Sequence, residues 1–214
     1  MLAVSGDLTQ RAKRTEFEQA RDFLKRLPHP QIVIPGNHDV PLYNPYGRFV
    51  SKWSRFREYI GENIEHFHVD AAIAVVGVNT SRALTWKGGR INAVQIEAVR
   101  RHLCSAPETA LKVVMVHHPL DVPLGWDPGN QAFRAGRALA QWRHCGVDMI
   151  LAGHAHIAHA SSDQSALRIG DHRAIIVQAG TATSTRGRGE PNSFNVADVF
   201  MIGLQRRSWK QALS

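Results

Sequence analysis

The chain has 214 residues, of which 43% are hydrophobic and 21% charged, and its formal net charge is +8 at pH 7. This composition argues against an intrinsically disordered chain, and the length suits a single domain, residues 1–214, with a sizeable buried core. No long apolar run predicts a membrane span, and the basic residues are dispersed among acids instead of forming a nucleic-acid platform.

Four short apolar runs along the chain end in polar side chains of the kinds that bind metals. The four sets are Asp7 after residues 1–5, Asn37 and His38 after residues 32–34, His117 and His118 after residues 111–116, and His154 and His156 after residues 147–152. A β-branched run stopped by Gly or Pro is typical of a buried strand that ends in a sharp loop. Open α/β sheets bind their ligands at such strand ends.

The residue types in these four sets indicate a metal site. Carboxylate oxygen, amide oxygen and imidazole nitrogen together are the ligands of borderline divalent ions such as zinc, manganese or iron. A single histidine at a strand end is more often a structural residue, but four such strand ends in one chain are hard to explain by chance. No cysteine accompanies them, which argues against a closed structural zinc site.

Between these strand ends the sequence alternates helical and extended patterns. Helical periodicity predicts helices over residues 15–27, 49–60, 92–103 and 131–144. Further strands are expected over residues 64–69, 72–78, 173–179 and 194–201, with the last two in a second sheet. The predicted fold class is therefore α/β, with two packed sheets and helices outside.

The polar sets and their order resemble a known family. Gly6-Asp7, Gly36-Asn37-His38-Asp39, His117-His118-Pro119 and Gly153-His154-x-His156 resemble the calcineurin-like metallophosphoesterase superfamily, and are most similar to its bacterial cyclic-nucleotide phosphodiesterases. The resemblance runs from residue 2 to about residue 200. It implies a four-layer sandwich of two mixed β-sheets flanked by helices. It also implies a centre of two divalent ions (Mn, Fe or Zn) and hydrolysis of phosphodiesters by a metal-bound hydroxide.

The resemblance also implies a role for each candidate ligand. Asp7 would bridge the two ions, because a carboxylate is anionic and has two oxygens. Asn37, His117 and His154 would hold the second ion, and His156 would help to hold the first.

Four other side chains are expected near the site without binding metal. By resemblance, His38 would hydrogen-bond the phosphate or donate a proton to the leaving oxygen. His118 is expected to orient its neighbour or to pack. Arg186 and Arg188 lie in a Gly-, Thr- and Ser-rich stretch that suits phosphate oxygens, with a solvated hairpin as the equal alternative.

One element of the family pattern is missing. The family opens with an Asp-x-His pair on a first strand, and no such pair precedes Gly6. We expect that the sequence starts inside a longer natural chain, because a fold without its first strand would expose unpaired backbone groups. With only Asp7 and His156 for the first ion, the chain is expected to hold one ion well and to be weakly active or inactive.

The leading hypothesis is thus a metal-dependent phosphodiesterase acting on a small phosphate ester such as a cyclic nucleotide. The alternatives are a nuclease or phosphomonoesterase of the same superfamily, and an inactive remnant that binds one metal. A nucleic-acid partner ranks lower, no membrane partner is expected, and nothing in the sequence indicates an oligomeric state. Cys104 and Cys145 lie on separate predicted helices without metal or redox spacing, which favours a reducing compartment and a cytoplasmic protein.

Overall fold

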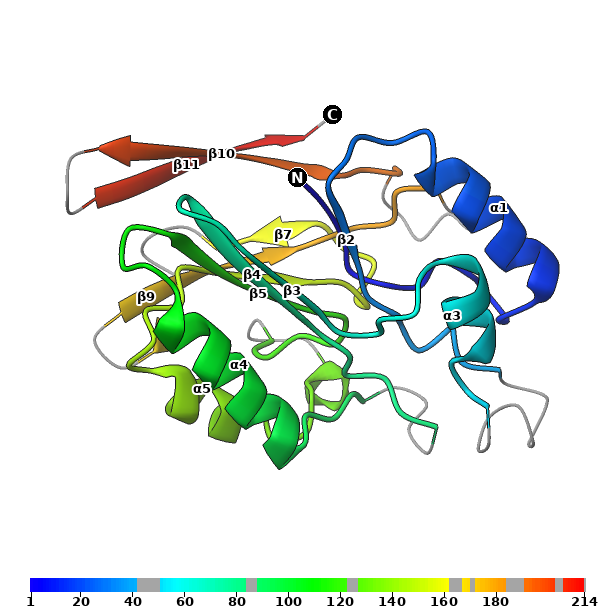
Figure 1. Cartoon of the computed structure of the whole chain (residues 1–214), viewed down its shortest axis with the longest axis horizontal. Coiled ribbons are helices and arrows are strands. Elements are labelled where there is room, and N and C mark those ends of the chain that lie inside the picture. The colour runs from blue at the N-terminus through cyan, green and yellow to red at the C-terminus, as the bar shows by residue number, and fades with distance from the viewer. Residues whose placement is uncertain are drawn as a thin grey trace.

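The structure, a computed structural model, describes residues 1–41, 51–83, 88–122, 127–161, 167–169, 172–183, 191–202 and 206–213. Two β-sheets face each other, and each sheet carries a pair of helices on its outer side (Figure 1). The α/β class predicted from the sequence is confirmed, and three apolar clusters fill the spaces between the four layers.

The larger sheet has the strand order β3-β4-β5-β6-β9-β7, with β8 pairing along β9. Its strands are β3 (His66–Val69), β4 (Ile73–Val78), β5 (Leu111–Val116), β6 (Met149–Ala152), β7 (His159–Ala160), β8 (Leu167–Ile169) and β9 (His172–Gln178). β4, β5, β6 and β9 run parallel, and β3, β7 and β8 pair antiparallel with their neighbours. All six residues of β5 are buried, as expected for a central parallel strand covered on both faces.

The smaller sheet consists of β1 (Leu2–Val4) and β2 (Gln31–Val33), which are parallel. Side chains alternate across β2, as the two-residue period of a strand requires. Ile32 and Ile34 pack against Val113 and Met115 of the larger sheet, whereas Val33 faces the helices on the other side. The two sheets are thereby held face to face.

Four helices form the outer layers. α1 (Arg14–Leu24) and α3 (Ser54–Tyr59) cover the smaller sheet, and α4 (Ala93–Ser105) and α5 (Ala135–Trp142) cover the larger one. A short 3₁₀ helix, η1 (Pro128–Asn130), precedes α5. Trp142 fixes α5 to α4 because its buried indole N–H donates to the Ile96 carbonyl at 2.9 Å. In the part of the chain that the structure describes, no helix has the length and apolar character needed to cross a bilayer.

The structure corrects one part of the predicted sheet arrangement. The strand expected over residues 173–179 is β9, but it lies in the larger sheet beside β6, with Ile150 opposite Ile176. The strand expected over residues 194–201 is β10 (Asn195–Ile202), which pairs antiparallel with β11 (Arg206–Leu213) in a separate two-stranded sheet (Figure 1). The assignment of both strands to one second sheet was wrong, because periodicity identifies a strand without identifying its partner.

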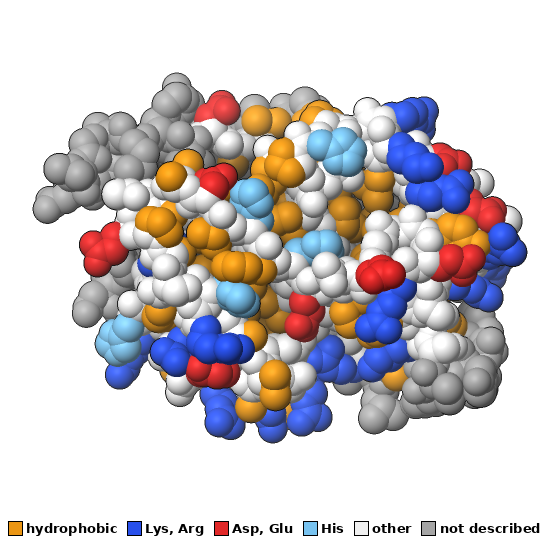
Figure 2. Space-filling model, viewed as in Figure 1, with side chains coloured by type: hydrophobic (Ala, Val, Ile, Leu, Met, Phe, Trp, Pro, Cys, Tyr) orange, Lys and Arg blue, Asp and Glu red, His pale blue; other side chains and the backbone are white. Residues whose placement is uncertain are grey.

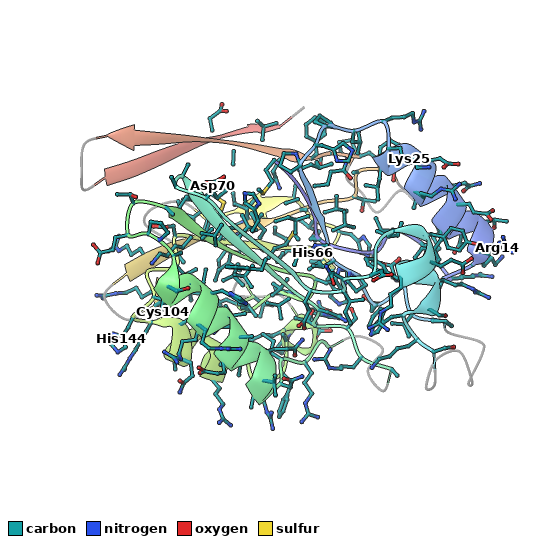
Figure 3. The ribbon with its side chains drawn as sticks, viewed as in Figure 1. Arg14, Lys25, His66, Asp70, Cys104 and His144 are labelled. Carbon is teal, nitrogen blue, oxygen red and sulfur yellow. A yellow bond between two sulfur atoms is a disulfide. The ribbon has the colours of Figure 1, made fainter. Side chains whose placement is uncertain are left out.

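The two cysteines form a disulfide, which the sequence analysis did not anticipate. Cys104 lies in α4 (labelled in Figure 3) and Cys145 follows α5, and their Cα atoms are 4.5 Å apart. A disulfide requires closeness in space and not a particular spacing in the sequence, and the packing of α5 on α4 supplies it. The cysteines therefore give no support to a reducing compartment.

The charges of the described residues are mixed on the face that Figure 2 shows. Lys and Arg side chains lie mainly along the margins of this face, and Asp and Glu side chains lie among them. This agrees with the dispersed basic residues of the sequence. A single basic track is not seen among the described residues of this face.

Candidate metal centre

The candidate ligands follow strands of both sheets, and the ends of these strands meet. β1 and β2 end before Asp7 and Asn37, and β5 and β6 end before His117 and His154. The Ser5 carbonyl lies 2.7 Å from Nδ1 of His117, which joins the end of the smaller sheet to the end of the larger one. Parallel strands place their carboxyl ends at the same edge, so both sheets deliver polar side chains to one place.

Four of the predicted site residues are linked through the amide oxygen of Asn37 and Nε2 of His117. This Oδ1 lies 2.8 Å from Nε2 of His117 and 3.0 Å from Nδ1 of His154. One carboxylate oxygen of Asp7, Oδ1, lies 3.4 Å from the same Nε2 of His117. The structure therefore brings together the carboxylate, the amide and two of the imidazoles.

The proton positions around His117 show that this cluster suits a cation. The Nδ1–H group of His117 donates to the Ser5 carbonyl, so in the neutral ring Nε2 carries a lone pair. That lone pair faces the oxygens of Asn37 and Asp7, which are also acceptors. The second oxygen of Asp7, Oδ2, is buried and has no hydrogen-bond partner within the described residues. With His117 in that neutral form, the converging acceptor atoms fit a divalent ion.

The protonation of His154 supports the same conclusion. Burial, and after it the neighbouring His117, lower the pKa of His154 to about 4. The ring is therefore neutral at pH 7 and keeps the lone pair that metal binding requires.

The backbone at the candidate ligands is strained. Three of the five non-glycine residues with positive φ in the described ranges are Asp7 (57°), His154 (72°) and His156 (60°). Each such residue costs on the order of 1–3 kcal/mol, and residues of this kind gather at functional sites. The backbone of Gly36 lies against Asp7 so closely that a Cβ on this residue would overlap the carboxylate and backbone nitrogen of Asp7.

Asp39 locks the two loops that carry Asp7 and Asn37 to each other. Its buried carboxylate accepts hydrogen bonds from the backbone N–H groups of Leu8 (3.2 Å), Thr9 (2.9 Å) and Gly36 (2.8 Å), and from the Thr9 hydroxyl (2.9 Å). Burial and the nearby Asp7 charge raise the pKa of Asp39 to about 6, so the group is still ionised at pH 7. This role was not anticipated from the sequence, although Asp39 stands in the Gly-Asn-His-Asp stretch.

His38 lies beside the candidate ligands and is oriented by the backbone. Its own N–H donates to Oδ1 of Asp7 at 3.0 Å, and its Nδ1 lies 3.0 Å from the carbonyl of Gln10. Since a carbonyl only accepts, Nδ1 carries the proton that it receives. Nε2 is left as the ring nitrogen that can act on another molecule.

The remaining predicted residues differ in how the structure places them. His156 is half-buried, its Nδ1 lies 3.1 Å from the Thr181 hydroxyl, and it lies near enough for its charge to act on His154. Arg186 and Arg188 fall outside the described residues, so their proposed contact with substrate is still a prediction.

His118 lies closer to the centre than expected. One ligand nitrogen from each of His117, His118 and His154 lies within 4.8 Å of the others, and the His118 and His154 rings are 4.5 Å apart. The Thr80 hydroxyl lies 2.8 Å from Nδ1 of His118 and accepts the backbone N–H of His118 at 3.1 Å. The His-His pair was the signal in the sequence that His118 could belong to the site. Only the fold shows where its ring lies.

Comparison with known proteins identifies the family of the chain. The model of the calcineurin-like phosphoesterase family matches residues 1–158, and the chain belongs to that family. A probable cyclic nucleotide phosphodiesterase from a Synechococcus species is 27% identical over a match of 168 residues, and the match covers 74% of this chain and 58% of that protein. The chain thus spans less than two thirds of the length of this relative.

Among solved structures, GAP50, described as the anchor in the inner membrane complex of Plasmodium, is similar over 88% of this chain and 62% of its own. The sequence identity is 12% and the TM-score is 0.49, which is too low a likeness to support an inference.

Proposed function

We propose that this chain is a metal-dependent phosphoesterase that hydrolyses phosphodiester bonds of small substrates, with cyclic nucleotides as the first class to test. The family assignment supports a hydrolase of phosphate esters. The name of the Synechococcus relative favours the diester over the monoester. The observation that carries the proposal is the convergence of acceptor atoms from Asp7, Asn37 and His117 on one point.

The proposed ligands are Asp7, Asn37, His117, His154 and His156, and the family site has two divalent ions. A bound ion would supply Lewis acidity towards the phosphoryl oxygens and towards the attacking water. The protein supplies the arrangement: Ser5 fixes the tautomer of His117, and Asp39 fixes the loops that carry Asp7 and Asn37. Such supporting hydrogen bonds set ligand orientation and basicity.

His38 is the proposed proton donor to the leaving oxygen. Its Nδ1–H is held by the Gln10 carbonyl, so a second proton on Nε2 would face outward from that contact. A doubly protonated imidazole can give this proton to an alkoxide as the ester bond breaks. Through its backbone N–H, His38 also holds Asp7, which couples the proton donor to a proposed metal ligand.

The test is metal binding together with a comparison of esters. After removal of metal with EDTA, we expect Mn²⁺ titration calorimetry to show binding that H117A and N37A weaken at least tenfold. The control is H144A, since His144 is exposed just after α5 and its Nε2 accepts a hydrogen bond from the neighbouring Arg143 (labelled in Figure 3). The wild type is expected to hydrolyse bis(p-nitrophenyl) phosphate and a cyclic nucleotide faster than p-nitrophenyl phosphate.

Each alternative has its own result. Faster hydrolysis of the monoester would make the protein a phosphomonoesterase, and preference for single-stranded DNA would make it a nuclease. Metal binding without hydrolysis of any of these esters would identify a metal-binding remnant. Absence of metal binding in the wild type would refute the proposal.

A further inference from the structure

Two arginines and a phenylalanine form a cluster on segments that contact His118 and Pro119, and we call it the Arg90–Phe133–Arg134 cluster. The guanidinium carbons of Arg90 and Arg134 lie 5.4 and 5.6 Å from the centroid of the Phe133 ring. Both distances are typical of cation–π contacts. The ring is 61% exposed, so the cluster is at the surface.

The backbone holds this cluster in a fixed frame. Arg90 and Phe133 form a parallel β-bridge, in which Phe133 N–H donates to the Gly89 carbonyl at 2.8 Å and Ile91 N–H to the Phe133 carbonyl at 3.2 Å. Arg90 N–H also donates to the Thr80 carbonyl at 2.8 Å. Arg134 has a left-handed backbone (φ 70°), which brings its guanidinium back over the preceding ring. A left-handed backbone at a non-glycine residue costs about 1–3 kcal/mol, and the folded structure holds Arg134 in this conformation before any ligand binds.

The positive charges of the cluster are not neutralised within the described residues. Arg14, Arg21 and Arg100 each form an ion pair with an acid, whereas neither Arg90 nor Arg134 takes part in any ion pair of the described part of the chain. Positive charge continues inward from Arg90. Burial lowers the pKa of Arg82, and the charge of Arg90 contributes to the lowering, although Glu65 opposes it.

The cluster is connected directly to the histidines. Gly89, which precedes Arg90, packs against His118 so closely that a Cβ on Gly89 would lie 2.5 Å from Nδ1 of the imidazole. The Ala132 N–H, next to Phe133, donates to the carbonyl of Pro119 at 2.9 Å. Arg90 and Phe133 are thus each one residue away from a residue that contacts the His118–Pro119 segment, and Arg134 is two residues away.

We propose that Arg90 and Arg134, held on the Phe133 ring, form an anion-binding subsite that receives a second phosphate group of a phosphodiester substrate. The inference rests on the proposed function for the position of the scissile diester. Guanidinium groups form paired, charge-assisted hydrogen bonds with phosphate oxygens, and stacking on an aromatic ring reduces the freedom that such binding must remove. The substrate class is therefore a phosphodiester with an additional terminal phosphate, in preference to a diester with a single charge.

The test uses two dinucleotides, ApA and pApA, which differ only in a terminal 5′-phosphate. Dissociation constants are measured by calorimetry in the metal-free protein, where no hydrolysis intervenes, and Michaelis constants are measured with Mn²⁺. We expect the wild type to bind pApA about tenfold more tightly than ApA, which is the effect of one charge-assisted contact. R90Q/R134Q is expected to bind both dinucleotides equally, with the affinity for ApA unchanged.

The matched control is R21Q/R26Q. It removes the same charge from two guanidiniums that also lie over aromatic rings: Arg21, in α1, lies over Tyr59, and Arg26, just after α1, lies over Phe23. This variant should keep the tenfold preference for pApA. Equal binding of the two dinucleotides by the wild type, or loss of the preference in R21Q/R26Q as well, would overturn the subsite. A preserved preference without hydrolysis of either dinucleotide would leave the subsite standing and exclude dinucleotides as substrates of the proposed activity.

Discussion

Replacement of Gly36 by alanine tests the packing on which the candidate metal centre depends. The new Cβ would lie 2.8 Å from the carboxylate carbon of Asp7 and would overlap atoms closer still, so Asp7 or the Gly36 backbone must move. The Gly36 backbone is itself held by the hydrogen bond from its N–H to Asp39 at 2.8 Å. Overpacking of this kind costs about 1–3 kcal/mol. For a chain of this size, that corresponds to a fall in Tm of roughly 5 °C.

The same substitution should weaken metal binding, because the displaced group is a proposed ligand. We expect at least a tenfold loss of Mn²⁺ affinity in calorimetry of G36A, the scale seen when groups that orient a ligand are disturbed. The matched control is G136A in α5, where a Cβ meets no atom within 4 Å. There alanine should stabilise the helix by about 0.5–1 kcal/mol and leave metal affinity unchanged. If G36A keeps the Tm and the Mn²⁺ affinity of the wild type, the close packing of Gly36 on Asp7 is refuted.

Three further perturbations follow from the contacts described above. D39N places an amide N–H₂ group against backbone donors, so we expect the free energy of unfolding measured in urea to fall by about 2 kcal/mol. An unchanged urea midpoint would contradict the role of Asp39 in holding the two loops together. The disulfide between Cys104 and Cys145 spans 41 residues, so C104S/C145S should lower the free energy of unfolding by about 3–4 kcal/mol, and free thiols in the unreduced wild type would disprove the pairing. T80V removes the hydroxyl that orients His118. If His118 supports the metal centre, the Mn²⁺ affinity should fall roughly tenfold. An unchanged affinity would show that His118 is not part of the centre.

Much of the secondary structure could be predicted because its signals are local. The helix predicted to start at Asn92 is α4, for which Asn92 is the N-cap residue. The Asn92 side chain accepts a hydrogen bond from the backbone N–H of Gln95 at 2.9 Å. β4 and β5 coincide with predicted apolar runs. The predicted helix over residues 131–144 is shorter in the structure, because Phe133 forms a β-bridge with Arg90 and Arg134 has a left-handed backbone before α5 begins.

The residues of the candidate site could be identified from the sequence, but their arrangement in space could not. The turn after each strand follows from Gly and Pro in the sequence, so the polar residues at the strand ends could be identified from the chain alone. Their meeting point could not be derived from local pattern. The family resemblance supplied it, and the metal-binding role of these residues stays a proposal.

The sequence by itself determined which segments become strands and helices and which polar groups stand at the strand ends, since periodicity and chain-breaking residues act over a few positions. Only the tertiary structure decided which strand pairs with β6, which helices bring the two cysteines together, and which atom holds each imidazole. Ser5 and His117 are 112 residues apart in sequence, yet the contact between them sets the tautomer of a proposed ligand. Such contacts exist only because two sheets pack face to face, and no local pattern in the sequence encodes that packing.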